Sequence, residues 1–128
     1  MLAVTLIASL SACSAQKHAT DKVRDIEFTV VEEKNIPEEL SAMIGEKKHT
    51  PLKLTYADKG ELFIARGYGT QSTSGYSIEV KECFETENAI YVHTNLIGPS
   101  KEEKIVEIET DPYIVIKMEF IDKNVVFQ

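Results

Sequence analysis

Alternation of apolar and polar residues recurs after Pro51, and it constrains the fold more than any other feature of this sequence. The segments 52–56, 76–81, 90–96 and 114–120 each place an apolar residue at nearly every second position. Successive side chains of a β-strand point to opposite faces, so this period predicts strands that bury one face. The pattern favours an antiparallel sheet, a sandwich or a partly open barrel of about seven short strands.

Turn-forming residues separate these strands, and the sequence predicts three further strands. Ala57-Asp58-Lys59-Gly60 predicts a tight reversal into a strand from Leu62, and Asp122-Lys123-Asn124 predicts a turn into Val125–Phe127. The alternation of residues 26–30 predicts a first strand. The connection from Gly98 to Pro112 mixes charges of both signs, and we expect a solvated loop around a short edge strand at 104–109.

Residues 36–48 follow a helical period instead. Pro37 and the two acids after it suit the first turn of a helix, and Lys47 and Lys48 suit its last turn. One apolar stripe is formed by Ile36, Leu40, Met43 and Ile44. The sequence therefore predicts one amphipathic helix of about three turns packed on a sheet, which makes the fold class α+β, mostly β.

Composition and net charge limit the number of domains and the classes of partner that this chain is expected to have. The chain has 128 residues, 43% of them hydrophobic and 27% charged, which predicts one globular domain. Fourteen basic and 21 acidic residues give a net charge of −7, which disfavours nucleic acid as a partner.

The N-terminus carries a targeting signal. Residues 1–12 are uncharged and rich in apolar and small residues, as in an export signal peptide. Leu10-Ser11-Ala12-Cys13 resembles a bacterial lipobox, which implies cleavage before Cys13 and a lipid on its sulfur. We therefore expect a signal peptide at 1–12, a polar tether at 13–25 and a domain at 26–128, lipid-anchored on the extracytoplasmic face of the cell envelope. A first buried strand or helix with an incidental cysteine is the alternative.

Cysteine and histidine positions give no metal or redox site. With Cys13 acylated, Cys83 has no partner within the chain, which excludes a disulfide framework. Cys83 is interpreted as a small apolar strand residue. Two cysteines and the scattered His18, His49 and His93 build no zinc spacing, and no cofactor is expected.

No catalytic constellation is visible in the sequence either. Enzymes need a nucleophile with a base, paired carboxylates or clustered metal ligands. Ser74 has no histidine near it in sequence, although the fold could bring His93 to it. We predict that the protein is not an enzyme.

The segment 67–76 has the composition of a contact loop. It holds three glycines and two tyrosines among small polar residues and carries no charge. Glycine allows close backbone approach, and tyrosine offers a rigid amphipathic surface. We predict that partner binding involves Tyr68, Gly69, Gln71, Thr73, Ser74, Gly75 and Tyr76. Tyr68 is the expected anchor, and Tyr76 is expected to pack inward; the alternative is a wide hairpin loop whose tyrosines cap the core.

These residues also carry a family resemblance. Leu62-Phe63-Ile64-Ala65-Arg66-Gly67-Tyr68-Gly69 followed by Gly75-Tyr76-Ser77-Ile78-Glu79-Val80 resembles the PrcB C-terminal domain family, and the likeness extends over residues 26–127. The resemblance implies a small lipoprotein that associates with a surface protease and stabilises it. We therefore expect a non-catalytic module with a protein partner, a surface or secreted protease.

A peptidase inhibitor is the alternative function. Gln71-Ser72-Thr73-Ser74-Gly75-Tyr76 is similar to the Asn-Pro-Thr-Thr-Gly-Tyr loop of chagasin-type inhibitors of cysteine peptidases, which are β-sandwiches of this size. This chain has no proline at position 72 and no tryptophan.

Overall fold

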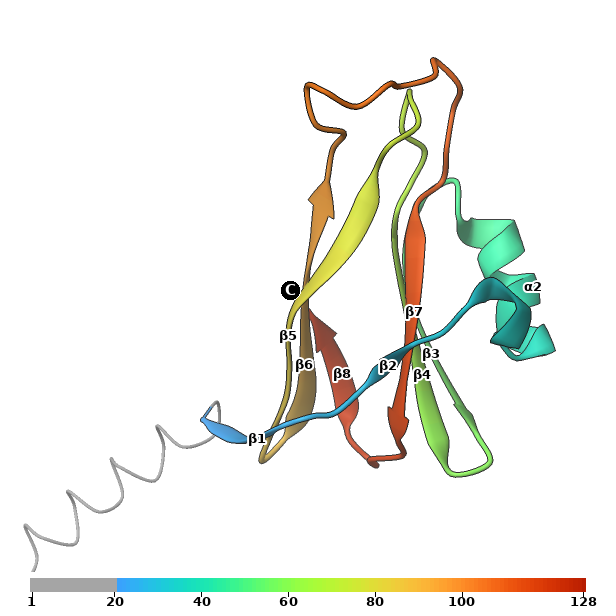
Figure 1. Ribbon diagram of the computed structural model, residues 1–128. Coiled ribbons are helices and arrows are strands. Elements are labelled where there is room, and N and C mark those ends of the chain that lie inside the picture. The colour runs from blue at the N-terminus through green and yellow to red at the C-terminus, as the bar shows by residue number, and fades with distance from the viewer. Residues whose placement is uncertain (1–20) are drawn as a thin grey trace, which may run out of the picture.

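The computed structural model describes residues 21–128, which form two four-stranded sheets packed face to face (Figure 1). The β5–β6 sheet has the strand order β1-β5-β6-β8 and consists of β1 (Lys22–Asp25), β5 (Ser77–Thr86), β6 (Ala89–Ile97) and β8 (Asn124–Phe127). The β4–β7 sheet has the order β2-β7-β4-β3 and consists of β2 (Thr29–Val30), β7 (Tyr113–Glu119), β4 (Glu61–Tyr68) and β3 (Pro51–Asp58). Of the three predicted architectures, the sandwich is the one that forms.

The main core lies between the two sheets. Alternate residues of β4, β6 and β7 point into it, as the period of two predicted. Its buried members are Ile26, Leu62, Ile64, Cys83, Ile90, Val92, Ile116 and Met118. The interpretation of Cys83 as a buried apolar strand residue is confirmed, since its side chain lies in this core.

A second core lies under the predicted helix. Helix α2 (Glu38–Lys47), preceded by the short 3-10 helix η2 (Glu33–Asn35), packs on the outer face of the β4–β7 sheet (Figure 1). The buried residues that share this second core are Ile36, Leu40, Ile44, Leu52, Phe63, Ala65 and Val115. Both faces of β7 are therefore covered: Val115 faces the helix side and Ile116 faces the other sheet. This double burial explains why β7 is nearly continuously apolar.

The predicted reversal before β4 is a two-residue hairpin. Lys59 and Gly60 connect β3 to β4 with φ angles of 49° and 79°. Positive φ at both central residues matches the twist of paired strands, and glycine adopts it without a steric penalty.

The predicted strand at 26–30 is not a single strand. β1 ends at Asp25, and residues 26–28 carry the chain from one sheet to the other before β2 begins at Thr29. Ile26 is buried in the core, but Val30 at the far end is exposed. The alternation arises because one side of the crossing segment lies over the core. Strand β1 falls within the predicted tether at 13–25.

The end of the chain also crosses between the sheets. Residues 120–123 leave β7, and β8 then pairs with β6 in parallel, in the opposite sheet. Lys123 anchors this crossing, because its Nζ donates to Glu85 Oε2 at 2.6 Å and to the Thr86 carbonyl at 2.8 Å. The strand ends one residue earlier than the alternation of 114–120 indicates, because Phe120 lies beyond β7 and is exposed.

The predicted edge strand at 104–109 does not form. These residues have no strand structure, and the nearest pairing is an isolated bridge between Gln71 and Thr110. All six side chains are exposed, so the alternation reflects no buried face. Within residues 21–128, no helix has the length and apolar character needed to span a bilayer.

Candidate functional site

Two loops meet at the end of the sandwich that lies at the top of Figure 1, and we call this region the loop end. They are the β4–β5 loop, residues 69–76, and the β6–β7 loop, residues 98–112. Gln71 and Thr110 exchange both of their backbone hydrogen bonds, with N···O distances of 2.8 and 3.0 Å. The two loops therefore form one connected surface.

Further contacts fix the predicted binding residues to the β6–β7 loop. The Ser74 backbone N–H donates to the Val106 carbonyl at 3.0 Å, and the Ser74 hydroxyl accepts from the Val106 N–H at 2.8 Å. The Thr110 hydroxyl donates to the Thr73 carbonyl at 2.8 Å. Gly75 has a φ of +91°, and a Cβ there would lie 2.8 Å from both Glu103 Oε2 and Pro99 Cβ. Only glycine fits this position without a shift of its neighbours.

An acidic residue ties the loop end to the segment after helix α2. Asp111 accepts a hydrogen bond from the Thr70 hydroxyl at 2.6 Å and lies 3.0 Å from Nδ1 of His49. The Thr70 hydrogen bond, aided by His49 and by the charge of Lys48, lowers the pKa of Asp111. Three segments that are distant in the sequence are thus joined at one carboxylate.

Tyr68, the predicted anchor, points between the sheets instead of out to solvent. Its hydroxyl lies 2.6 Å from Oγ1 of Thr94 on β6, and the Arg66 guanidinium stacks over its ring at 4.0 Å from the centroid. Arg66 Nη1 donates to the Gly67 carbonyl, while its buried Nε has no hydrogen-bond partner among the described residues. Tyr76 is half-buried, with its ring next to Gly98. Tyr68 therefore supports the loop end from between the sheets, and Tyr76 packs beside Gly98 within the loop end.

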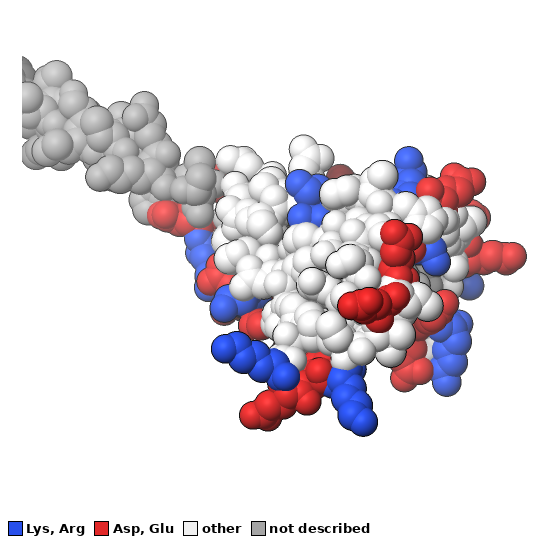
Figure 2. Space-filling model, turned by 90° about the horizontal axis from the view of Figure 1, so that it is seen from above, with Lys and Arg blue, Asp and Glu red and all other residues white. Residues whose placement is uncertain are grey.

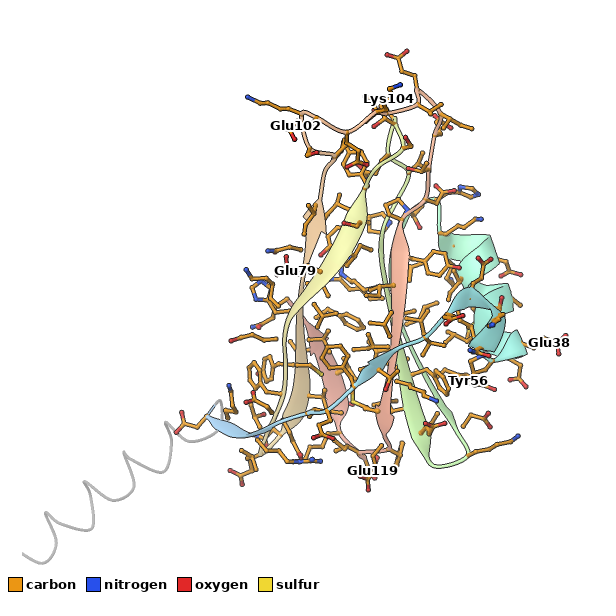
Figure 3. The ribbon with its side chains drawn as sticks, in the orientation of Figure 1. Glu38, Tyr56, Glu79, Glu102, Lys104 and Glu119 are labelled. Atoms are coloured by element: carbon orange, nitrogen blue, oxygen red, sulfur yellow. The ribbon has the colours of Figure 1, made fainter. Side chains whose placement is uncertain are left out.

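The most exposed apolar side chains of the loop end belong to the β6–β7 loop and to the end of β6. Ile105, Val106 and Ile108 have exposed fractions of 46%, 61% and 58%, and Ile97 is also exposed. We call these four residues the aliphatic patch. Viewed from above, uncharged residues cover much of this end, and most charged side chains stand at its margin (Figure 2). Glu102 and Lys104 project from the same loop (Figure 3).

The seven predicted binding residues all lie within residues 68–76. The aliphatic patch lies beside them, and the sequence analysis did not indicate it. Within this loop only Thr70 and Ser72 are exposed, and neither was among the seven. Thr73, Ser74 and Gly75 contact the β6–β7 loop, so the 71–76 segment does not project as a free tip. The signal for the patch was the sequence Ile105-Val106-Glu107-Ile108, which we interpreted as an edge strand. Partner binding by the seven residues stays a prediction.

The residues considered for catalysis are not assembled. Ser74 bonds to Val106 in the loop end, whereas His93 lies within β6 opposite Glu82. Burial raises the pKa of the Cys83 thiol to about 11, so it is protonated and unreactive at neutral pH. No group of three or more potential metal ligands occurs among residues 21–128. The predicted lipidation site, Cys13, lies outside the described residues.

A hollow of about 790 Å³ opens beside the segment that crosses between the sheets at residues 26–28. Side chains of both signs line it, and Lys117 Nζ lies 3.5 Å from Glu61 Oε2 at its wall.

One comparison with known proteins gives a match. The family model described as PrcB C-terminal matches residues 62–119. No curated protein and no solved structure matches the chain. The matched segment starts in β4, ends with β7 and contains both loops of the loop end. The resemblance indicated by the sequence is therefore confirmed over residues 62–119, which carry the PrcB C-terminal family pattern, and its extension over residues 26–127 stays a prediction.

Proposed function

We propose that this chain is a lipid-anchored, non-catalytic binding module of the bacterial cell envelope, which associates with a partner protein and stabilises it. The observation that carries the proposal is the aliphatic patch, because three of its four exposed side chains belong to the four residues 105–108 of a single loop. Exposed apolar groups clustered at one place mark interaction surfaces in soluble domains.

The position of the patch suits an anchored protein. Strand β1, which forms the last part of the predicted tether, lies at the end of the sandwich away from the loop end (Figure 1). A chain attached through Cys13 would therefore present the loop end away from the membrane. Two or more acyl chains hold such an anchor stably.

The loop end is also stiff enough to bind without a large ordering cost. The β4–β5 loop, the β6–β7 loop and His49 are joined by the hydrogen bonds of Gln71, Ser74 and Asp111. A preorganised surface loses less conformational entropy on association than a mobile loop does.

A protease is the proposed partner. The support is the family match, since the family is named for a lipoprotein subunit that associates with a surface protease. The segment that matches includes the whole loop end.

One pair of valines allows a matched test. Val106 at the loop end and Val23 in β1 have nearly equal exposure, 61% and 62%. We expect Val106→Ser to reduce capture of the partner from detergent-solubilised membranes by the full-length chain, and Val23→Ser to leave it unchanged. The captured protein is identified by mass spectrometry and assayed for protease activity.

Loss of the partner in cells completes the test. We expect the captured protease to be degraded faster in a strain that lacks this chain. Equal capture by both variants, or an unchanged lifetime of the partner, would contradict the proposal.

A further inference from the structure

Two cations stand side by side on one face of the β3–β4 hairpin. Lys53 and Arg66 are directly opposite each other in the register of the two strands. Residues opposite each other point to the same face of a sheet, with Cβ atoms about 4.5–5.5 Å apart, and like charges placed in this way destabilise the sheet. Leu54 and Ala65, the next residues in register, pack under helix α2. Lys53 and Arg66 therefore face the other way, toward the β5–β6 sheet.

Neither of these cations has an acidic partner among the described residues. Arg24, the other arginine of the chain, has its Nε 2.7 Å from Glu85 Oε1. Arg66 and Lys53 form no ion pair with any residue that the structure describes, although the chain carries a net charge of −7. Two neighbouring cations without a counter-charge attract an anion.

The hydrogen bonds of the Arg66 guanidinium leave one of its edges unused. Nη1 donates to the Gly67 carbonyl, and the guanidinium lies over the Tyr68 ring. Nε and Nη2, whose N–H groups run parallel along one edge, donate to no described residue. The Nε is buried, and a buried N–H without an acceptor is costly. Such an edge matches the two oxygens of a carboxylate.

We propose that Arg66 and Lys53 bind a carboxylate of the partner protein, supplied by an aspartate or glutamate side chain. The inference rests on the proposed function and names a chemical group that the partner presents. Of the two unused nitrogens only Nε is buried, so Nη2 is open to solvent. The carboxylate bonds first to Nη2 and then side-on to both nitrogens, once the guanidinium moves enough to uncover Nε. The exposed Lys53 ammonium approaches from the neighbouring strand.

The position of this site suits a partner that covers the loop end. Lys53 and Arg66 are each two residues from the end of their strand. Pro51 and Tyr68, which are opposite each other in register, separate them from the loop end. The carboxylate site and the aliphatic patch therefore belong to the same end of the sandwich.

The charge of the loop end favours a carboxylate over a phosphate. Residues 98–112 hold five acidic and two basic residues, which give a net charge of −3. This acidic loop repels a doubly charged anion more strongly than a singly charged one. An aspartate or glutamate next to apolar residues complements both the two cations and the aliphatic patch.

Free acetate tests the site without the partner. The chain has two arginines, so NMR spectra of the full chain can follow both Nε–H signals, and Arg24 is the internal control because Glu85 already binds it. Sodium acetate replaces sodium chloride at constant ionic strength. We expect acetate to shift the Arg66 signal in a saturable manner and to leave the Arg24 signal unchanged. Sodium phosphate should bind more weakly than acetate.

Two lysine variants provide a matched comparison. Lys53→Gln removes an exposed cation of the site, and Lys59→Gln removes an exposed cation at the far end of the same hairpin. We expect Lys53→Gln to weaken acetate binding about two- to fivefold and Lys59→Gln to leave it unchanged. Thermal denaturation should show that both variants fold, since neither side chain is buried. Arg66→Lys keeps the charge but lacks the edge with two parallel N–H groups, so it should bind acetate more weakly than the wild type.

Each outcome supports or overturns the inference. Support requires the saturable Arg66 shift, its weakening in Lys53→Gln, and reduced capture of the partner by Lys53→Gln but not by Lys59→Gln. An absent or unsaturable shift, tighter binding of phosphate, or equal effects of the two lysine variants would overturn it. If acetate binds but Lys53→Gln captures the partner normally, the inference is wrong and the proposed function stands. If acetate binds as expected but no protease is captured by the wild type, the carboxylate site stands and the proposed function is wrong.

Discussion

The hydroxyl groups of Tyr68 and Thr94 lie 2.6 Å apart and join the two sheets where the apolar core ends. Tyr68 is the last residue of β4, and Thr94 is buried in β6. Below this pair the space between the sheets is filled by residues such as Ile64 and Val92, while above it lie the loops of the loop end. The hydrogen bond therefore fixes the position of the loop end relative to both sheets.

Removing this hydrogen bond should destabilise the fold. We expect Tyr68→Phe to lower the free energy of unfolding by about 1 kcal/mol, because the buried Thr94 hydroxyl loses its partner. Thr94→Val should cost a similar amount, and the double variant should cost less than the sum of the two. Urea denaturation of the three variants measures this coupling. Strict additivity would show that the two hydroxyls do not interact.

The strand β7 provides a test of the main core. Ile116 is buried between the sheets, so Ile116→Ala should lower the free energy of unfolding by about 2–5 kcal/mol. Glu119, exposed at the end of the same strand, is the control, and Glu119→Ala should cost less than about 0.5 kcal/mol. Denaturation midpoints that coincide would mean that the faces of β7 are assigned wrongly.

Substituting alanine for Gly75 and for Gly45 should change the free energy of unfolding in opposite directions. Gly75→Ala places a Cβ 2.8 Å from Pro99 Cβ at a φ of +91°, which should cost about 1–3 kcal/mol and separate the two loops. Gly45 lies exposed in α2 with nothing within 4 Å of the new Cβ, so Gly45→Ala should stabilise the protein by about 0.5–1 kcal/mol. Thermal denaturation of the two variants measures both changes in stability. A stabilised Gly75→Ala would refute the close packing of the loops.

Asp111 should make stability depend on pH in the acid range. Because its pKa is lower in the folded state, its ionised form stabilises the fold above the pKa of the unfolded chain, and this contribution is lost as the pH falls through the folded pKa. Thr70→Val removes the largest cause of the lowered pKa. We expect this variant to be less stable at neutral pH and to lose less stability on acidification. Unfolding curves recorded across the acid range would show parallel losses if Thr70 has no such role.

Membrane attachment is tested at Cys13. We expect Cys13→Ala to move the protein from the membrane fraction to a soluble or signal-retained form, because the lipid that anchors it cannot be attached. Fractionation and mass spectrometry of the mature N-terminus measure this. Unchanged fractionation together with an unmodified cysteine in the wild type would rule out the anchor.

Local patterns in the sequence predicted those parts of the fold that neighbouring residues determine. The β3–β4 hairpin could be predicted from Lys59-Gly60 between two alternating segments alone. Helix α2 could be predicted from its apolar stripe and flanking residues. Strand partners, in contrast, are chosen by packing between distant segments. The turn at 122–124 indicated a change of direction, but nothing near it indicated that β8 would join β6 in the other sheet.

The loop end was predicted in part for the same reason. The glycines and tyrosines of residues 67–76 indicated an unusual loop, and that loop does lie at the candidate surface. Whether Tyr68 faces solvent or Thr94 depends on the distance between two sheets, which no local pattern encodes. The alternation of 104–109 indicated a strand, but these residues form none and their side chains are exposed.

The β5–β6 sheet takes its border strands from the two extremes of the described chain, since β1 begins at Lys22 and β8 ends at Phe127. The β1 border needs the chain as far as Thr86 of β5, and the β8 border needs nearly the whole described chain. Pairing between such distant segments closes large loops and is slow. A chain of this topology stays unfolded for longer after synthesis than one built from local contacts, and such a delay would suit the export that we propose, since export machinery threads unfolded polypeptides.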